Sequence, residues 1–141
     1  MGVTYFLAKS DEYYDLAWHR TAGTGGVFLI ILAHEIDLLR HLVGEITAVS
    51  AMASSATRGR DVEDTGALSL TFADGALASL IISDTVPAPW SRDLTAGDSP
   101  RFPAHEIESH CIGGTSASLT IPTLEVWKHT GERSWTTPLR P

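Results

Sequence analysis

The sequence is poor in cysteine and in basic residues, and it has no long apolar run. Cys111 is the only cysteine among 141 residues, which excludes an internal disulfide and a cysteine-rich zinc site. Ten Lys and Arg residues stand against 17 Asp and Glu residues. The resulting formal charge of −7 disfavours nucleic acid and anionic membranes as partners. The longest apolar run, residues 27–33, is far shorter than the roughly 20 residues that cross a bilayer.

The remaining composition is that of a folded protein. Hydrophobic residues make up 43% and charged residues 19% of the chain, and its length suits one domain with its own core. We therefore expect a single domain over residues 1–141. The N-terminus has no basic region of the kind that begins a signal peptide. Together with the single cysteine, this fits a soluble protein in the cytoplasm.

One long helix is predicted from about Gly25 to Val43. Thr24 precedes it as a candidate cap, and Gly44 follows it where a left-handed residue commonly ends a helix. Leucines, isoleucines and a valine recur at helical spacing and form one apolar stripe. The members of this stripe are Leu29, Leu32, Ile36, Leu39 and Val43.

Most of the other segments have strand character. Strands are predicted at 3–8, 46–56, 67–72, 76–83, 106–112, 116–121, 124–129 and 134–136. The Asp74-Gly75 pair favours a hairpin between the third and the fourth of them. Residues 9–20 are expected to form a loop or short helix. Residues 87–103 form a long proline-containing loop, a type that is usually functional or mobile.

This pattern predicts an α+β domain. We expect a mostly antiparallel, open-faced sheet of about six strands, with helices packed on one face. Many alternate strand positions are alanine, for example Ala51, Ala67 and Ala78. Such small side chains suit close packing of the other sheet face against a second copy. The sequence therefore predicts a homodimer or a higher oligomer.

Two motifs at the helix have both a functional and a structural interpretation. Gly23-Thr24-Gly25-Gly26 precedes a helix, where anions bind, but Phe28 replaces the third glycine of a dinucleotide fingerprint. The alternative is that Gly25 and Gly26 let the helix start close to a strand. His34 lies among apolar neighbours on the helix, as either a hydrogen-bonded core residue or a catalytic residue.

Other kinds of site have weaker support. A metal site would use His34, Glu35 and His41 with His19 or His110, but Leu38 stands where a zincin motif has its second histidine. A serine hydrolase would need a Gly-x-Ser-x-Gly elbow, and the sequence has none.

Tryptophan and arginine cluster in two predicted loops. Trp18-His19-Arg20 forms one cluster and Pro89-Trp90-Ser91-Arg92 forms the other. Tryptophan offers a flat surface to a sugar ring, and arginine binds carboxylate or phosphate in a bidentate manner. Alternatively, each tryptophan closes an end of the sheet. We expect Trp18, Arg20 and Trp90 to bind substrate, and Asp37 to do so or to pair with Arg40 or His41.

An ordered set of short motifs carries a family resemblance. The set begins with Gly25-Gly26, His34-Glu35-Ile36-Asp37-Leu38-Leu39-Arg40 and Val43-Gly44-Glu45. It continues with Val62-Glu63-Asp64-Thr65, Phe72-Ala73-Asp74-Gly75-Ala76-Leu77-Ala78, Ser83-Asp84-Thr85 and Ala88-Pro89-Trp90. It ends with Ile112-Gly113-Gly114-Thr115 and Ser118-Leu119. In this order, over nearly the whole chain, the motifs resemble the C-terminal domain of Gfo/Idh/MocA oxidoreductases.

The resemblance implies half of a two-domain enzyme. In that family an N-terminal Rossmann domain binds NAD or NADP, and the C-terminal domain holds a sugar, inositol or related polyol and forms the oligomer. It also implies that His34 is the histidine that assists proton transfer at the substrate. The Rossmann domain, its glycine fingerprint and its catalytic lysine are absent here, and Lys9 is not that lysine. Many members carry Asp four residues before the histidine, where this chain has Ile30.

Three hypotheses follow. In the first, the chain is a fragment or engineered piece of an NAD(P)-dependent oxidoreductase. The start of the sequence just before a predicted strand favours this hypothesis. Alternatively, it is a stand-alone module that binds a sugar-like ligand or only dimerises. The third hypothesis, an unrelated α+β hydrolase, has no supporting motif. Under the first we expect no cofactor site, no metal site and no activity in this chain alone.

Overall fold

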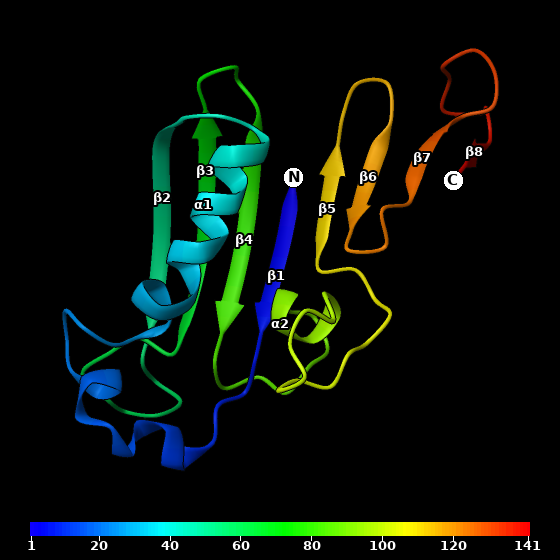
Figure 1. Ribbon diagram of the computed structural model, residues 1–141. Helices are drawn as coiled ribbons and strands as arrows, with labels where there is room; N and C mark the ends of the chain where they lie inside the picture. The colour runs from blue at the N-terminus through cyan, green and yellow to red at the C-terminus, as the bar shows by residue number, and fades with distance from the viewer.

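The protein folds around one open sheet, which a computed structural model describes over residues 1–141 (Figure 1). Eight strands lie in the order β2-β3-β4-β1-β5-β6-β7-β8. They are β1 (Gly2–Phe6), β2 (Ile46–Ser54), β3 (Thr65–Phe72), β4 (Leu77–Ser83), β5 (His110–Gly113), β6 (Ser118–Ile121), β7 (Val126–His129) and β8 (Leu139–Arg140). Adjacent strands are antiparallel except β1 and β4, which are parallel. The predicted α+β class and mostly antiparallel sheet are confirmed, with eight strands where about six were expected.

The helices lie on one face and at one end of this sheet (Figure 1). Two short 3₁₀ helices, η1 (Asp11–Asp15) and η2 (Ala17–Arg20), follow β1. A π-helical segment, η3 (Phe28–Leu32), leads into α1 (Ala33–Leu42), and a short α2 (Arg92–Thr95) lies within the long loop. None of these helices has the length and the apolar character that a bilayer span requires.

The predicted long helix exists, but its start differs from the prediction. Thr24 does not cap it, because its hydroxyl donates to the carbonyl oxygens of Trp18 and Thr21. The Glu63 carboxylate instead accepts the N–H of Phe28 at 2.9 Å, and the first turns are π-helical. The end is as predicted, since Gly44 has φ +124°, which favours glycine.

The core lies between the helix and the face of the sheet that the helix covers. Alternate residues of the central strands are buried there against residues of η3 and α1. This cluster includes Val3, Tyr5, Leu68, Leu70, Phe72, Leu80, Ile82, Ile31, Leu32 and Leu39. A Cβ atom on Gly25 would lie 2.1 Å from the backbone oxygen of His19. Gly25 is therefore required for close packing, but the helix start packs against η2 and not against a strand as expected.

No helix covers the opposite face of β1–β4, which we call the open face. Met52, Leu77 and Ile81 on this face are 75%, 65% and 42% exposed. Cys111 of β5 is exposed and lines a cavity on this face with Gly2, Thr4 and Ile81. Strand alternation places His110 in the core and turns its neighbour Cys111 away from it.

The C-terminal segments differ most from the prediction. Residues 134–136 were expected to form a strand but form part of a turn, and the last strand is β8 at 139–140. The long loop at 87–103 is partly ordered by α2, whose first turn is capped by the Ser91 hydroxyl. These differences leave the central strands unaffected.

Candidate functional site

A cavity of about 540 Å³ lies at the end of the sheet where the parallel strands β1 and β4 finish. We call it the His34 cavity. Four parts of the chain line it: β1, the η1–η2 segment, the η3–α1 helix and the long loop. The lining residues are Tyr5, Lys9, Glu12, Tyr13, Leu16, His19, Ile30, Ile31, His34, Arg92, Asp93, Arg101 and Phe102.

His34 reaches the cavity from the first turn of α1. Its side chain is exposed, and Ile30 and Ile31 of the preceding π-helical segment line the wall beside it. A π-helical turn of this kind often occurs at functional sites. Two carboxylates, Glu12 and Asp93, line the same cavity, so acidic groups are present even though Ile30 replaces the family's usual aspartate.

Tyr5 and Asp93 form a polar pair on the cavity wall. The Tyr5 phenol donates a hydrogen bond to Asp93 Oδ2 at 2.5 Å. Burial raises the pKa of Tyr5, and the hydrogen bond and charge of Asp93 raise it further, so the phenol stays protonated as a donor. The Tyr5–Asp93 hydrogen bond joins β1 to α2, while Arg92 lies 3.5 Å from Asp93 and 3.5 Å from Asp98 within the long loop.

A buried hydrogen-bonded pair lies behind His34. Glu35 is 0% exposed and His110 is 1% exposed, and Glu35 Oε2 is 2.7 Å from His110 Nε2. The other ring nitrogen, Nδ1, is 2.9 Å from the Ser109 hydroxyl. The second carboxylate oxygen, Oε1, has no hydrogen bond and lies 3.8 Å from Arg92 Nε. Because Glu35 is the next residue after His34, this pair fixes the rotation of α1 that turns His34 towards the cavity.

The pairing of Glu35 with His110 bears on the metal hypothesis. Both residues were considered as metal ligands with His34 and His41. No group of three or more His, Cys, Asp or Glu residues has the arrangement that could hold a metal ion. Glu35 and His110 instead share one hydrogen bond between α1 and β5.

A second buried cluster holds the η1–η2 segment in place. The Tyr14 phenol donates to the Asp84 carboxylate, and Arg58 Nε donates to the same carboxylate at 3.3 Å. Arg58 also donates to the backbone oxygen of Lys9 at 2.8 Å. Burial raises the pKa of both Tyr14 and Asp84. This cluster therefore fixes the cavity wall that carries Lys9 and Tyr13.

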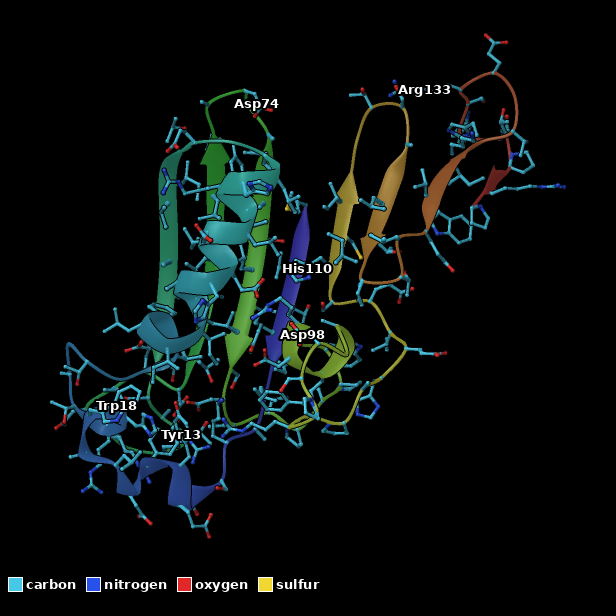
Figure 2. The ribbon with its side chains drawn as sticks, in the orientation of Figure 1. Tyr13, Trp18, Asp74, Asp98, His110 and Arg133 are labelled. Carbon is cyan, nitrogen blue, oxygen red and sulfur yellow. The ribbon has the colours of Figure 1, made fainter.

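Aromatic stacking shapes the same wall. The rings of Tyr13 and His19 are parallel within 5°, with centroids 3.7 Å apart, and both line the cavity. Trp18 packs edge-on against His19 but is 51% exposed and does not line the cavity. Figure 2 shows Tyr13 and Trp18 at the same end of the molecule, far from Asp74 at the β3–β4 hairpin.

The predicted site residues do not all come together. His34 lines the cavity, while Trp18 and Arg20 lie beside it on η2. Asp37 is exposed one helical turn further along α1. Trp90 contacts Phe6 edge to face, with centroids 6.4 Å apart, and lines a different cavity of about 530 Å³ with Gly2, Thr4 and Ile81. Trp90 is therefore on the side of the sheet away from His34.

Sequence reasoning missed several residues of the cavity. Tyr5, Lys9, Asp93 and Arg101 were not predicted as site residues, and Arg92 was named only as part of its loop cluster, yet all of them line the cavity. The long loop was the available signal, because a loop of this length is usually functional or mobile. It supplies three of these residues, Arg92, Asp93 and Arg101.

Comparison with known proteins agrees with this architecture. The family model described as "GFO/IDH/MocA C-terminal domain" matches residues 3–104. No curated protein matches the chain. The WlbA dehydrogenase of Chromobacterium violaceum, in complex with NADH and UDP-GlcNAcA, is 27% identical with a TM-score of 0.64. The match covers 85% of this chain and 31% of that one.

Two further solved structures are similar. The WlbA dehydrogenase of Bordetella pertussis, also with NADH and UDP-GlcNAcA, is 25% identical with a TM-score of 0.65, covering 85% of this chain and 31% of that one. A levoglucosan dehydrogenase in complex with NADH and levoglucosan is 24% identical with a TM-score of 0.65. The match covers 99% of this chain and 37% of that one, and at this identity it shows the fold alone. The chain thus spans about a third of the length of these structures. With the family model matching residues 3–104, the chain belongs to the GFO/IDH/MocA C-terminal domain family.

Proposed function

We propose that residues 1–141 form one substrate-binding and oligomerisation domain of an NAD(P)-dependent oxidoreductase that acts on a sugar, inositol or related polyol. The observation that carries this proposal is the position of His34, which faces a cavity of about 540 Å³ in a chain of this family. The WlbA structures, crystallised with NADH and UDP-GlcNAcA, support a carbohydrate substrate.

The residues of this chain do not fit the cofactor. Its glycine segment lacks the third glycine of a dinucleotide fingerprint, and the Glu63 carboxylate already accepts the N–H of Phe28 at the helix start. A pyrophosphate there would meet a carboxylate instead of free N–H groups. NAD(P) is therefore held by another part of the enzyme, and we expect calorimetry to detect no NAD binding to this chain. Micromolar affinity would contradict that expectation.

His34 is proposed to move a proton at the substrate. An imidazole is suited to accept the proton of a hydroxyl that is being oxidised to a carbonyl. The π-helical segment and the Glu35–His110 hydrogen bond orient the helix that carries it. Tyr5 and Tyr13 place phenol side chains on the cavity wall, which suit the hydroxyl groups of a polyol. Trp18, Arg20, Asp37 and Trp90 stay predictions as substrate contacts.

Turnover tests this role in the enzyme that joins this chain to its nucleotide-binding domain. We expect His34→Asn to lower kcat by about 10² to 10⁴, the usual contribution of a general acid or base. His41→Asn is the matched control, since His41 is exposed on the same helix and does not line the cavity. Equal rates for the two variants would contradict a catalytic role for His34.

The open face is the proposed subunit contact, and a homodimer or higher oligomer is expected. Its outward positions on β2, β3 and β4 carry no charged residue. They include Ala48, Ser50, Met52, Ser54, Thr65, Ala67, Ser69, Thr71, Leu77, Ser79 and Ile81. We expect Ile81→Glu to place an unpaired charge in the contact and to shift the protein to monomer in sedimentation. A monomeric parent protein would contradict the proposal.

A further inference from the structure

Two cations stand between two cavities at the substrate end of the domain. The His34 cavity shares Lys9, Glu12, Tyr13, Arg101 and Phe102 with a second cavity of about 610 Å³. The second cavity, which we call the loop cavity, has a largely apolar remainder that includes Leu7, Ala8, Pro87, Ala88, Leu94 and Pro103. Lys9 and Arg101 therefore belong to a wall common to both cavities.

Neither cation has an anionic partner in the protein. The arginines nearby are neutralised: Arg58 pairs with Asp11 and Asp84, and Arg92 with Glu35, Asp93 and Asp98. Lys9 and Arg101 form no salt bridge at all.

Both cations rest on aromatic rings instead. Lys9 Nζ lies 4.9 Å from the centroid of the Tyr13 ring, and Arg101 Cζ lies 5.6 Å from that of Phe102. Such contacts hold the long side chains while leaving their N–H groups free to donate.

The carboxylates of the His34 cavity, Glu12 and Asp93, form no salt bridge with either cation. Asp93 accepts the Tyr5 hydrogen bond and pairs with Arg92, and Glu12 is exposed. Burial lowers the pKa of Lys9, the charge of Asp93 opposes this effect, the positive charge of Arg101 adds to it, and the charge of Asp84 again opposes it. An anion between Lys9 and Arg101 would give both cations the direct ion pair that no carboxylate of the protein makes with them.

We propose that Lys9 and Arg101 form a subsite for an anionic group of the substrate, a phosphoryl or a carboxylate. The substrate is then an acidic glycoside. Its reacting sugar lies beside His34, its anionic group lies between the two cations, and any further part extends into the loop cavity. Lysine and arginine suit both anions, since arginine binds them in a bidentate manner and lysine acts as a compact charge. This inference rests on the proposed function and adds the charge of the substrate.

Calorimetry on the 141-residue chain tests the subsite. The probes are inorganic pyrophosphate, glucose 1-phosphate, glucuronate and neutral glucose. We expect an anionic probe to bind at least about tenfold more tightly than glucose, a ratio equivalent to 1.4 kcal/mol. Binding of the phosphates alone identifies a phosphoryl group and binding of glucuronate alone a carboxylate, and either result supports the subsite.

Matched variants locate the binding. Lys9→Met and Arg101→Met should remove the preference for the anion, with folding checked by tryptophan fluorescence. Lys128→Met and Arg133→Met are the controls, because both residues line a separate cavity at the far end of the sheet, where Figure 2 shows Arg133. Controls that weaken binding as much as the test variants, equal binding of glucose and the anions, or no anion binding would each overturn the subsite.

The pyrophosphate arm separates this inference from the proposed function. Pyrophosphate contains no sugar, and its binding requires neither His34 nor a cofactor. Failure of pyrophosphate and the other anions to bind, with turnover still dependent on His34, rejects the subsite alone. Binding of an anion at Lys9 and Arg101, with turnover independent of His34, rejects the catalytic proposal alone.

Discussion

Replacing Glu35 by methionine removes the only carboxylate that hydrogen-bonds to the buried His110. The Glu35–His110 contact is 2.7 Å long, and both side chains are at most 1% exposed. Losing a hydrogen bond to a charged group costs about 1.5–3 kcal/mol, and a buried ring nitrogen without a partner costs about 1–3 kcal/mol more. Glu35 Oε1 already lacks a hydrogen bond, so part of the burial cost is present in the parent protein. We therefore expect a loss of about 3 kcal/mol, at the lower end of the range for broken buried pairs.

Urea denaturation followed by tryptophan fluorescence measures this loss. The Arg40–Glu45 salt bridge provides a matched control, since it is 2.6 Å long but its side chains are 51% and 70% exposed. Glu45→Met should cost less than about 1 kcal/mol, as exposed pairs do. If Glu35→Met costs no more than Glu45→Met, the buried pair does not fix α1 as argued.

A double-mutant cycle tests the coupling itself. With His110→Leu added to Glu35→Met, neither polar group is left buried alone, so the double variant should lose less than the sum of the single losses. We expect a coupling energy above about 1 kcal/mol for two groups in direct contact. Additive losses would show that the two side chains act independently.

Lys9 and Gly25 give two further predictions. Burial lowers the pKa of Lys9 in the folded protein below its ordinary value of 10.5, which the unfolded chain keeps. As pH rises, the folded protein therefore loses this proton first, and the free energy of unfolding increases with pH between the folded and the unfolded pKa. Lys9→Met should therefore stabilise the protein near pH 7, by less than about 1 kcal/mol for a partly solvated group, and this gain should vanish as pH approaches 10.5. A pH-independent difference in urea denaturation would contradict this. Gly25→Ala should lower the free energy of unfolding by about 2 kcal/mol or more, because its Cβ would lie 2.1 Å from the backbone oxygen of His19. Gly2→Ala is the control and should not destabilise the protein, because nothing lies within 4 Å of its Cβ position. Equal melting temperatures for the two variants would contradict the close packing at Gly25.

Local signals in the sequence predicted the central fold well. Asp74-Gly75 marks the β3–β4 hairpin, where Gly75 has φ +87°, and Gly44 marks the end of α1. Alternation predicted the buried face of β3, since Leu68, Leu70 and Phe72 all enter the core. Each of these signals depends only on residues that are close together in the sequence. The sequence alone is therefore enough to predict the hairpin, the helix end and the buried face of the strand.

The site could be predicted only in part, because its contacts join distant residues. Glu35 and His110 are 75 positions apart, and Tyr5 and Asp93 are 88 positions apart. No periodicity connects such residues before the sheet order is known. Trp90 illustrates the converse: its loop composition suggested a substrate contact, but the fold places it against Phe6, in a cavity that His34 does not line. The family resemblance identified His34 but not the cavity that surrounds it.

A nuclear magnetic resonance titration of this chain with neutral and acidic glycosides tests directly whether the His34 cavity binds substrate. We expect the ring signals of His34 and Tyr13 to shift in a saturable manner, because both residues line this cavity. The indole signal of Trp127, which lines a separate cavity at the far end of the sheet, should remain unchanged. Shifts confined to Trp127, or no saturable shift at His34 with any glycoside, would contradict the assignment of the His34 cavity as the substrate site.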